Sequence, residues 1–240
     1  MKKTLIFIPA YNVEKFIFKL FERIPIKIFK NNNINFLIIN DNSTDRTQNE
    51  IKKIKSNFKY KIKDINLSKN IGYGGVQKLA FDFAIKKKFK YCVMLHGDGQ
   101  YTPKKLPKIL KLLKSDNYDA VFGSRMKQYK SAIQGGMPIY KFLGNILLTK
   151  LQNLILSSNL SEFHSGYRSF KTDALKKINY RVNTNSYHFD TEIIIKLLSK
   201  NLKIHEVHIP TIYGEQISHL KSIPYGLNTL FTTIKFRLKR

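Results

Sequence analysis

The sequence predicts an α/β protein with a doubly wound, mostly parallel sheet flanked by helices in a single domain. In the first half, short apolar runs rich in β-branched residues alternate with segments of helical periodicity. The apolar runs are nearly continuous, as in strands that helices cover on both faces. With 240 residues, 42% of them hydrophobic, the chain can bury a sizeable core and is not a disordered basic tail.

Strands and helices alternate through the first half. An apolar run at 4–9 ends at a proline, and apolar residues then recur at helical spacing. After the second run, Ser43, Thr44 and Asp45 are typical helix-capping residues, and Pro103 suits the first turn of a helix. The expected strands are 4–9, 35–40, 60–66, 91–95 and 120–123, and the expected helices are 13–24, 45–56, 75–88 and 103–114.

Beyond residue 123 the alternation loosens. A long amphipathic helical stretch at 139–156 precedes a strand at 166–170, a helix at 190–199 and a strand at 203–209. Apolar residues at helical spacing over 227–238 lie among basic residues with no acid. We expect a main domain over 1–218 and a basic amphipathic helix within 219–240 that can lie on a membrane surface.

The chain carries 43 Lys and Arg against 16 Asp and Glu, a net charge of +27. Two interpretations of this charge stay open. Codon bias in an AT-rich genome could have enriched lysine without selection for function, or the positive charge could bind an anionic partner. The basic residues are spread along the chain without a nucleic-acid-binding signature, so we expect no nucleic-acid partner. Because arginine is scarce, its placement is more informative than that of lysine.

The N-terminal apolar run is too short for a signal peptide, and no window holds the roughly 20 apolar residues of a membrane-spanning helix. The single Cys92 lies in an apolar run, which is typical of a buried thiol in a reducing compartment. The sequence predicts a cytoplasmic protein, either free or peripheral on the inner face of the membrane.

Polar residues follow the ends of the expected strands. Tyr11 and Asp41 come after the first and second strands and are expected to share one crevice, where an aromatic ring can stack on a base and a carboxylate can bind a ribose hydroxyl. The segment Asn70-Ile-Gly-Tyr-Gly-Gly75 lacks the third glycine of a dinucleotide fingerprint. A turn that approaches a phosphate and a plain turn are both open there.

The segment His96-Gly-Asp-Gly-Gln-Tyr101 follows the fourth strand. Packing poorly explains Asp98, a carboxylate between two glycines at the mouth of the crevice. Together with His96 and Gln100, it could hold a divalent cation that bridges a diphosphate and stabilises a departing nucleoside diphosphate.

These segments together resemble the family-two glycosyltransferases, and in particular the dolichol-phosphate-mannose synthase-like branch of polyprenyl-phosphate glycosyltransferases. The resemblance covers nearly the whole chain and includes Gly123-Ser-Arg125 and Ser165-Gly-Tyr-Arg168. It implies the GT-A fold and metal-dependent, inverting transfer of a hexosyl group from a nucleoside-diphosphate sugar. The residues that it implies are nucleotide contacts at Pro9, Ala10, Tyr11, Asn12, Glu14, Asp41, Asn70 and Gly74, metal ligands at His96, Asp98 and Gln100, and acceptor or phosphate contacts at Ser124, Arg125 and Arg168.

The chain departs from the family pattern at two positions. His96 replaces an aspartate, and because imidazole suits softer ions, it favours Mn²⁺ over Mg²⁺ as the cofactor. The alternative is that His96 does not bind the metal itself and only donates a hydrogen bond to one of the metal ligands. Val13 stands where the family often has glutamate, and Glu14 follows one position later.

The need for a catalytic base depends on the acceptor. An alcohol needs a carboxylate, for which Asp190 is preferred over Glu162 and Glu192, whereas a lipid phosphate is already an anion. The stretch 139–156, the basic C-terminal helix and the net charge favour a polyprenyl phosphate. Arg125, assigned a catalytic role with Asp98 and Asp190, suits bidentate phosphate binding, as does Arg168, with an internal ion pair as the alternative for each.

Other functions stay open. Within enzymes, the alternative is transfer to a glycan hydroxyl in cell-surface polysaccharide synthesis. From another class, a nucleic-acid-binding or non-catalytic nucleotide-binding protein would share some of these features. The sequence selects neither the donor base nor the sugar.

Overall fold

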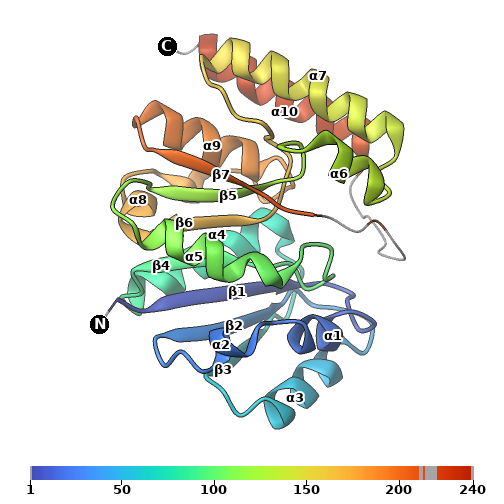
Figure 1. Cartoon of the computed structure of the whole chain (residues 1–240), viewed down its shortest axis with the longest axis vertical. Helices are drawn as coiled ribbons and strands as arrows, with labels where there is room; N and C mark the ends of the chain where they lie inside the picture. The colour runs from blue at the N-terminus through green and yellow to red at the C-terminus, as the bar shows by residue number, and fades with distance from the viewer. Residues whose placement is uncertain (1, 211–212, 214–220, 239–240) are drawn as a thin grey trace.

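Seven strands form one sheet in the order β3-β2-β1-β4-β6-β5-β7, in a computed structural model that describes residues 2–210, 213 and 221–238 (Figure 1). The sheet has helices on both faces, so the expected α/β class is confirmed. The strands are β1 (Thr4–Ala10), β2 (Ile34–Asn40), β3 (Ile62–Asn66), β4 (Tyr91–Met94), β5 (Ala120–Ser124), β6 (Arg168–Lys171) and β7 (Ile204–His208).

The sheet is mostly parallel, as predicted. β6 runs antiparallel to both of its neighbours, β4 and β5, and the remaining pairs are parallel. Ala10 at the end of β1 lies opposite Asn40 at the end of β2. Tyr11 and Asp41 therefore leave the sheet at the same edge, where parallel sheets bind ligands.

Two layers of helices cover the sheet because alternate strand residues point to opposite faces. Ile6 and Ile8 share a core with α1, α2, α3 and α5, while Leu5 and Phe7 share the other core with α4, α8 and α9. The bounds are α1 (Ile17–Glu22), α2 (Ile26–Phe29), α3 (Thr47–Asn57), α4 (Gly72–Lys86), α5 (Leu106–Lys114), α8 (Thr172–Lys176) and α9 (Phe189–Ser199), with single 3₁₀ turns at Pro103–Lys105 and Tyr180–Val182.

Two long helices, α7 (Ile139–Leu156) and α10 (Ser222–Leu238), lie side by side beyond β7, with the short α6 (Tyr129–Gln134) next to them (Figure 1). We call α7 and α10 the helix pair. It stands outside the two layers that cover the sheet. Within the described residues, no helix is both long and apolar enough to cross a membrane.

The expected elements are present with shifted ends. The helix expected at 75–88 begins at Gly72, the strand expected at 60–66 begins at Ile62, and the C-terminal helix expected within 219–240 spans Ser222–Leu238. Helices α2, α6 and α8 were not predicted, since four to six residues are too few to show helical periodicity. The predicted boundary between 218 and 219 lies outside the described residues.

Candidate active site

A cavity of about 890 Å³ opens at the carboxyl ends of β1, β2 and β4 and extends to the helix pair. One end is formed by the segments that follow these strands, and the other by Tyr140, Gly144 and Leu148 of α7 with Ser222 and Tyr225 of α10. The predicted site residues that line it are Pro9, Ala10, Tyr11, Asn12, Glu14, Asp41, Asn70, His96, Asp98, Gln100, Arg125 and Asp190. Gly74, Ser124 and Arg168 are not among the lining residues.

Backbone hydrogen bonds join the loops after β1 and β2. The N–H of Asn12 donates to Ser43 Oγ over 3.0 Å, and the N–H of Glu14 donates to Asp45 Oδ2 over 3.1 Å. In return, the N–H of Arg46 donates to Glu14 Oε2 over 2.7 Å. Glu14 thus joins the two loops by hydrogen bonds and also lines the cavity.

The expected capping of α3 is only partly confirmed. Asp45 Oδ1 accepts a hydrogen bond from the N–H of Thr47 over 2.9 Å, at the start of the helix. The expectation for Ser43 and Thr44 was wrong, because both bind Asn12 of the neighbouring loop instead. Asn12 has a left-handed backbone, with φ 52°, which an asparagine tolerates.

Asp41 holds the start of α4. Its Oδ1 accepts from the N–H of Ile71 over 2.7 Å and its Oδ2 from the N–H of Gly72 over 3.0 Å. These are N–H groups at the beginning of a helix, where a carboxylate is favourable. Asp41 also lines the cavity beside Tyr11, so the two residues share one crevice as predicted.

The glycine turn is a docking point for the loop 183–188. The N–H of Gly74 donates to the carbonyl oxygen of Asn185 over 2.7 Å. A Cβ at Gly74 would lie 2.4 Å from Thr184 O, and one at Gly72, where φ is +79°, would lie 2.7 Å from Asn185 O. Since protein groups accept from the N–H groups of residues 71, 72 and 74, the plain structural turn is the better of the two interpretations.

Replacement by alanine is expected to change the free energy of unfolding in opposite directions at Gly74, where another segment approaches closely, and at Gly144, where none does. Gly74→Ala should lower the free energy of unfolding by about 1–3 kcal/mol, because the added methyl group displaces the 183–188 backbone. Gly144→Ala, in α7, would place its methyl group with nothing else within 4 Å and should raise stability by up to about 1 kcal/mol. Urea unfolding measures both, and equal effects would contradict the docking argument.

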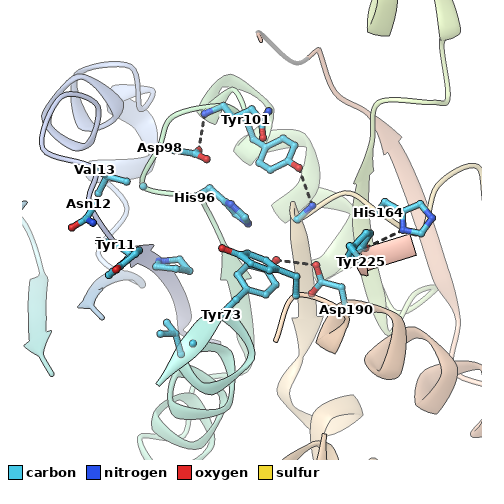
Figure 2. A pocket seen from close by; sticks show the side chains of 18 of the residues that line it. Tyr11, Asn12, Val13, Tyr73, His96, Asp98, Tyr101, His164, Asp190 and Tyr225 are labelled. Carbon is cyan, nitrogen blue, oxygen red and sulfur yellow. Dashed lines mark hydrogen bonds between the residues drawn. The ribbon is translucent and has the colours of Figure 1, made fainter. Parts of the chain in front are cut away.

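Tyrosines that the sequence analysis did not single out join the two ends of the cavity. Figure 2 shows Tyr73 between His96 and Asp190, and its hydroxyl donates to Asp190 Oδ2 over 2.8 Å. The Tyr73 ring stacks on Tyr187 at 5.2 Å between centroids. Burial and the neighbouring Asp190 raise the pKa of Tyr73 well above its ordinary value, so its hydroxyl stays protonated. The signal for Tyr73 was its place inside the glycine segment.

Asp98 and His96 have different surroundings. Asp98 Oδ1 accepts from the backbone N–H of Gln100 over 2.9 Å, which fixes the carboxylate at the cavity wall (Figure 2). His96 Nε2 is buried and has no hydrogen-bond partner among the described residues. It faces Gly166, where a Cβ would lie 2.3 Å away. His96 also lines the cavity, so a ligand bound there would meet its imidazole ring.

Asp190 is held by two donors. Besides Tyr73, the side-chain amide of Gln77 donates to Asp190 Oδ1 over 3.0 Å. Asp190 is 7% exposed and lines the cavity. The two hydrogen bonds engage both carboxylate oxygens and fix the orientation of the side chain at the cavity wall.

Arg125 forms the internal ion pair that the sequence left open. Its Nε donates to Glu162 Oε1 over 2.7 Å, its Nη2 also binds Glu162, and its Nη1 donates to Tyr213 over 2.7 Å. Burial alone would raise the pKa of Glu162, but the attraction and hydrogen bonds of Arg125 outweigh it and lower the pKa. Arg125 lines the cavity with its donors already engaged.

Arg168 has no carboxylate partner among the described residues. It is 1% exposed and lies over the Phe122 ring at 4.3 Å, and its Nε and Nη1 lack hydrogen-bond partners in the described structure. Burial, with Arg125 and Arg168 nearby, lowers the pKa of His164 to about 3 although Glu162 opposes this. His164 is therefore neutral at physiological pH, and its Nδ1 lies 3.0 Å from the Tyr225 hydroxyl (Figure 2).

A polar crevice at the carboxyl ends of parallel strands, with Asp98 at its wall and a long cavity behind it, is the place where enzymes of the α/β class bind their ligands. The sequence matches Glycosyl transferase family 2 over residues 5–179, and the chain belongs to this family. The predicted use of a nucleotide sugar as donor is thereby confirmed.

Relatives with named activities cover most of the chain. It is 28% identical over 225 residues to the UDP-N-acetylglucosamine–dolichyl-phosphate N-acetylglucosaminyltransferase of Methanococcus voltae, covering 89% of this chain and 87% of the relative. It is 31% identical over 156 residues to the low-salt glycan biosynthesis hexosyltransferase Agl6 of Haloferax volcanii, covering 65% of this chain and 36% of that protein.

Solved structures confirm the GT-A fold. Glucosyl-3-phosphoglycerate synthase from Mycobacterium tuberculosis, in complex with Mn²⁺, UDP-glucose and phosphoglyceric acid, has a TM-score of 0.69 and 13% identity. The match covers 99% of this chain and 80% of that one. The same enzyme is also known with Mg²⁺ and UDP.

Proposed function

We propose that this chain transfers a hexosyl group, with inversion, from a nucleoside-diphosphate sugar to a polyprenyl phosphate. The observation that carries the proposal is the continuous cavity, which joins the strand ends to the helix pair, where Tyr140, Leu148 and Tyr225 line it together with the basic Lys141. A polyprenyl phosphate has the chemistry to fill that second end. The Methanococcus voltae relative, whose name includes dolichyl phosphate, supports the same acceptor class.

We assign the donor end to the residues at the strand ends. Tyr11 and Asn12 would contact the nucleoside with Asp41 and Asn70, all of which line the crevice. Gly74 would act indirectly, by letting the loop 183–188 dock. Ser124, whose Oγ is 2.7 Å from Ser161 Oγ, would support the wall rather than touch the acceptor.

A divalent cation fits the wall at Asp98. Within the described residues there is no cluster of three His, Cys, Asp or Glu side chains that could hold a metal alone. Mg²⁺ and Mn²⁺ are commonly bound by one or two carboxylates together with substrate phosphates, so Asp98 suffices with a diphosphate. His96 and Gln100 would complete the protein ligands. The bound ion would supply charge stabilisation for the leaving diphosphate.

The acceptor would need no strong base. A phosphate monoester is an anion at neutral pH, so it can attack without losing a proton to Asp190. Asp190, oriented by Tyr73 and Gln77, would instead position the sugar hydroxyls. Arg168, buried behind the wall and without a carboxylate partner among the described residues, would keep this end of the cavity positive, whereas Glu162 balances the charge of Arg125.

The test is product analysis with the purified chain. UDP-hexoses, UDP-N-acetylhexosamines and GDP-hexoses are each supplied with farnesyl phosphate and Mn²⁺ or Mg²⁺, and mass spectrometry identifies the product. We expect a sugar-phospholipid from one class of donor. A glycoside formed only with an oligosaccharide acceptor would replace the proposal by the glycan alternative, and no transfer to any acceptor would contradict it.

A further inference from the structure

The helix α7 buries polar side chains and exposes apolar ones. Its buried side chains are polar, namely Asn145, Thr149 and Gln152, and they recur at helical spacing. Five of its apolar side chains are exposed, namely Ile139 (72%), Tyr140 (66%), Leu143 (58%), Leu147 (60%) and Leu154 (79%). Phe142 and Ile146 are partly buried against a small apolar cluster. A surface helix in water shows the opposite pattern, with apolar residues toward the core.

The helix α10 repeats the inversion. Thr229 and Thr233 are fully buried, while the exposed apolar side chains are Ile223 (78%), Leu227 (65%), Phe231 (64%), Ile234 (41%) and Leu238 (81%). Gln152 Nε2 donates to Thr233 Oγ1 over 3.2 Å between the two helices. A buried seam of small and polar residues with apolar residues outward is the arrangement of helices packed in lipid.

The rest of the chain offers a contrast. In α5, the buried residues are Leu106, Ile109, Leu110 and Leu113, and its lysines point away from the core. The inversion is therefore a property of the helix pair, not of a chain with many apolar residues. The exposed apolar side chains of these two packed helices are called the apolar face of the helix pair below, and soluble monomers rarely leave so many of them uncovered.

The charges around this face indicate what covers it. No Asp or Glu occurs over 126–161 or over 216–240, while Lys141, Lys150, Lys235 and Arg237 lie on the helix pair. A second copy of the same face would bring like charges together. A surface with anionic groups and an apolar interior satisfies both the basic and the apolar residues.

We infer that the helix pair inserts as a unit into one leaflet of an anionic bilayer, with its apolar face in the lipid and its polar seam between the helices. The sequence analysis names 139–156 and the C-terminal helix as separate amphipathic segments, and the inference adds that the two insert together as a packed pair. An 18-residue helix is about 27 Å long and lies in the plane of the interface. The inference does not depend on the identity of the acceptor.

The chain has no tryptophan, so a single introduced tryptophan is a clean probe of depth. Leu143→Trp and Phe231→Trp report on the two helices, and Val182→Trp, at a site 71% exposed, is the matched control. With vesicles of phosphatidylcholine and phosphatidylglycerol, emission of the two helix-pair probes should shift to the blue and be quenched by lipids brominated on the acyl chain. The control should show neither change.

A second variant separates insertion from surface adsorption. Leu147→Glu with Leu227→Glu, both at exposed positions, should weaken vesicle sedimentation by about tenfold or more, because two apolar side chains no longer enter the lipid. Ile26→Glu, at a site 56% exposed, should sediment like the wild type. Binding of the wild type should persist at high salt, which removes purely electrostatic adsorption.

Three outcomes would overturn the inference. They are helix-pair probes that stay exposed in the presence of vesicles, sedimentation that high salt abolishes, and a dimer in solution whose helix-pair probes are already shielded without vesicles. Transfer to farnesyl phosphate is assayed separately without vesicles. A chain that inserts but does not transfer would thus contradict the proposed acceptor and leave the insertion standing.

Discussion

Replacing Asp98 by asparagine is expected to lower the turnover of sugar transfer about 1000-fold, equivalent to about 4 kcal/mol of transition-state stabilisation. Asp98 is the carboxylate held at the cavity wall by the N–H of Gln100, and asparagine keeps its shape while removing its charge. Steady-state assays with saturating donor measure the loss. The melting temperature without ligand should stay near that of the wild type.

Asp116→Asn is the matched control, since that carboxylate is 95% exposed and remote from the cavity lining. It should leave turnover unchanged. His96→Ala distinguishes the two roles left open for the imidazole. A larger rise in the Mn²⁺ requirement than in the Mg²⁺ requirement supports ligation by the imidazole, whereas equal rates with both ions at unchanged requirement contradict it.

Removing the carboxylate of Glu162 is expected to lower the free energy of unfolding by about 3–5 kcal/mol. Glu162 is 1% exposed and accepts from Arg125 and Asn145, so Glu162→Ala leaves a buried guanidinium without its anion. Glu50→Ala, which breaks the surface pair with Lys53, should cost less than about 1 kcal/mol. Urea unfolding at neutral pH compares the two variants, and similar losses would contradict the argument.

The same pair predicts an acid dependence. The pKa of Glu162 is lower in the folded chain than its ordinary value, so its ionisation favours the folded state. This stabilisation is complete above the ordinary value of about 4.3 and is lost as the pH falls through the lower folded pKa. The difference in stability between wild type and Glu162→Ala should therefore shrink in acid, which unfolding measured from neutral pH downward would show.

The fold could be predicted because it depends on local patterns. Continuous apolar runs and helical stripes determine the strands and long helices, and parallel topology then brings Tyr11, Asp41 and Asp98 to one edge. The antiparallel course of β6 is different. It depends on a pairing between residues far apart in the sequence, which no local pattern reports.

The site was predicted less completely, because many of its contacts also join residues that are far apart in the sequence. Asp41 was correctly placed at the cavity, but its hydrogen bonds to Ile71 and Gly72 depend on how two distant segments meet. The pairing of Arg125 with Glu162 likewise joins residues 37 positions apart. Tyr73 and Tyr187 line the cavity as aromatic neighbours. Apart from the place of Tyr73 inside the glycine segment, nothing in the sequence distinguishes them from core aromatics.

The position of β6 has an evolutionary consequence. β5 and β6 are antiparallel neighbours, which a turn of a few residues could join. Instead, residues 125–167 leave the sheet between them and carry Arg125, α6, α7 and Glu162. The strands that end at Tyr11, Asp41 and Asp98 are β1, β2 and β4, which all precede this excursion in the chain. Changes in descent that are confined to the excursion and α10 would therefore alter the far end of the cavity and leave those strand ends as they are.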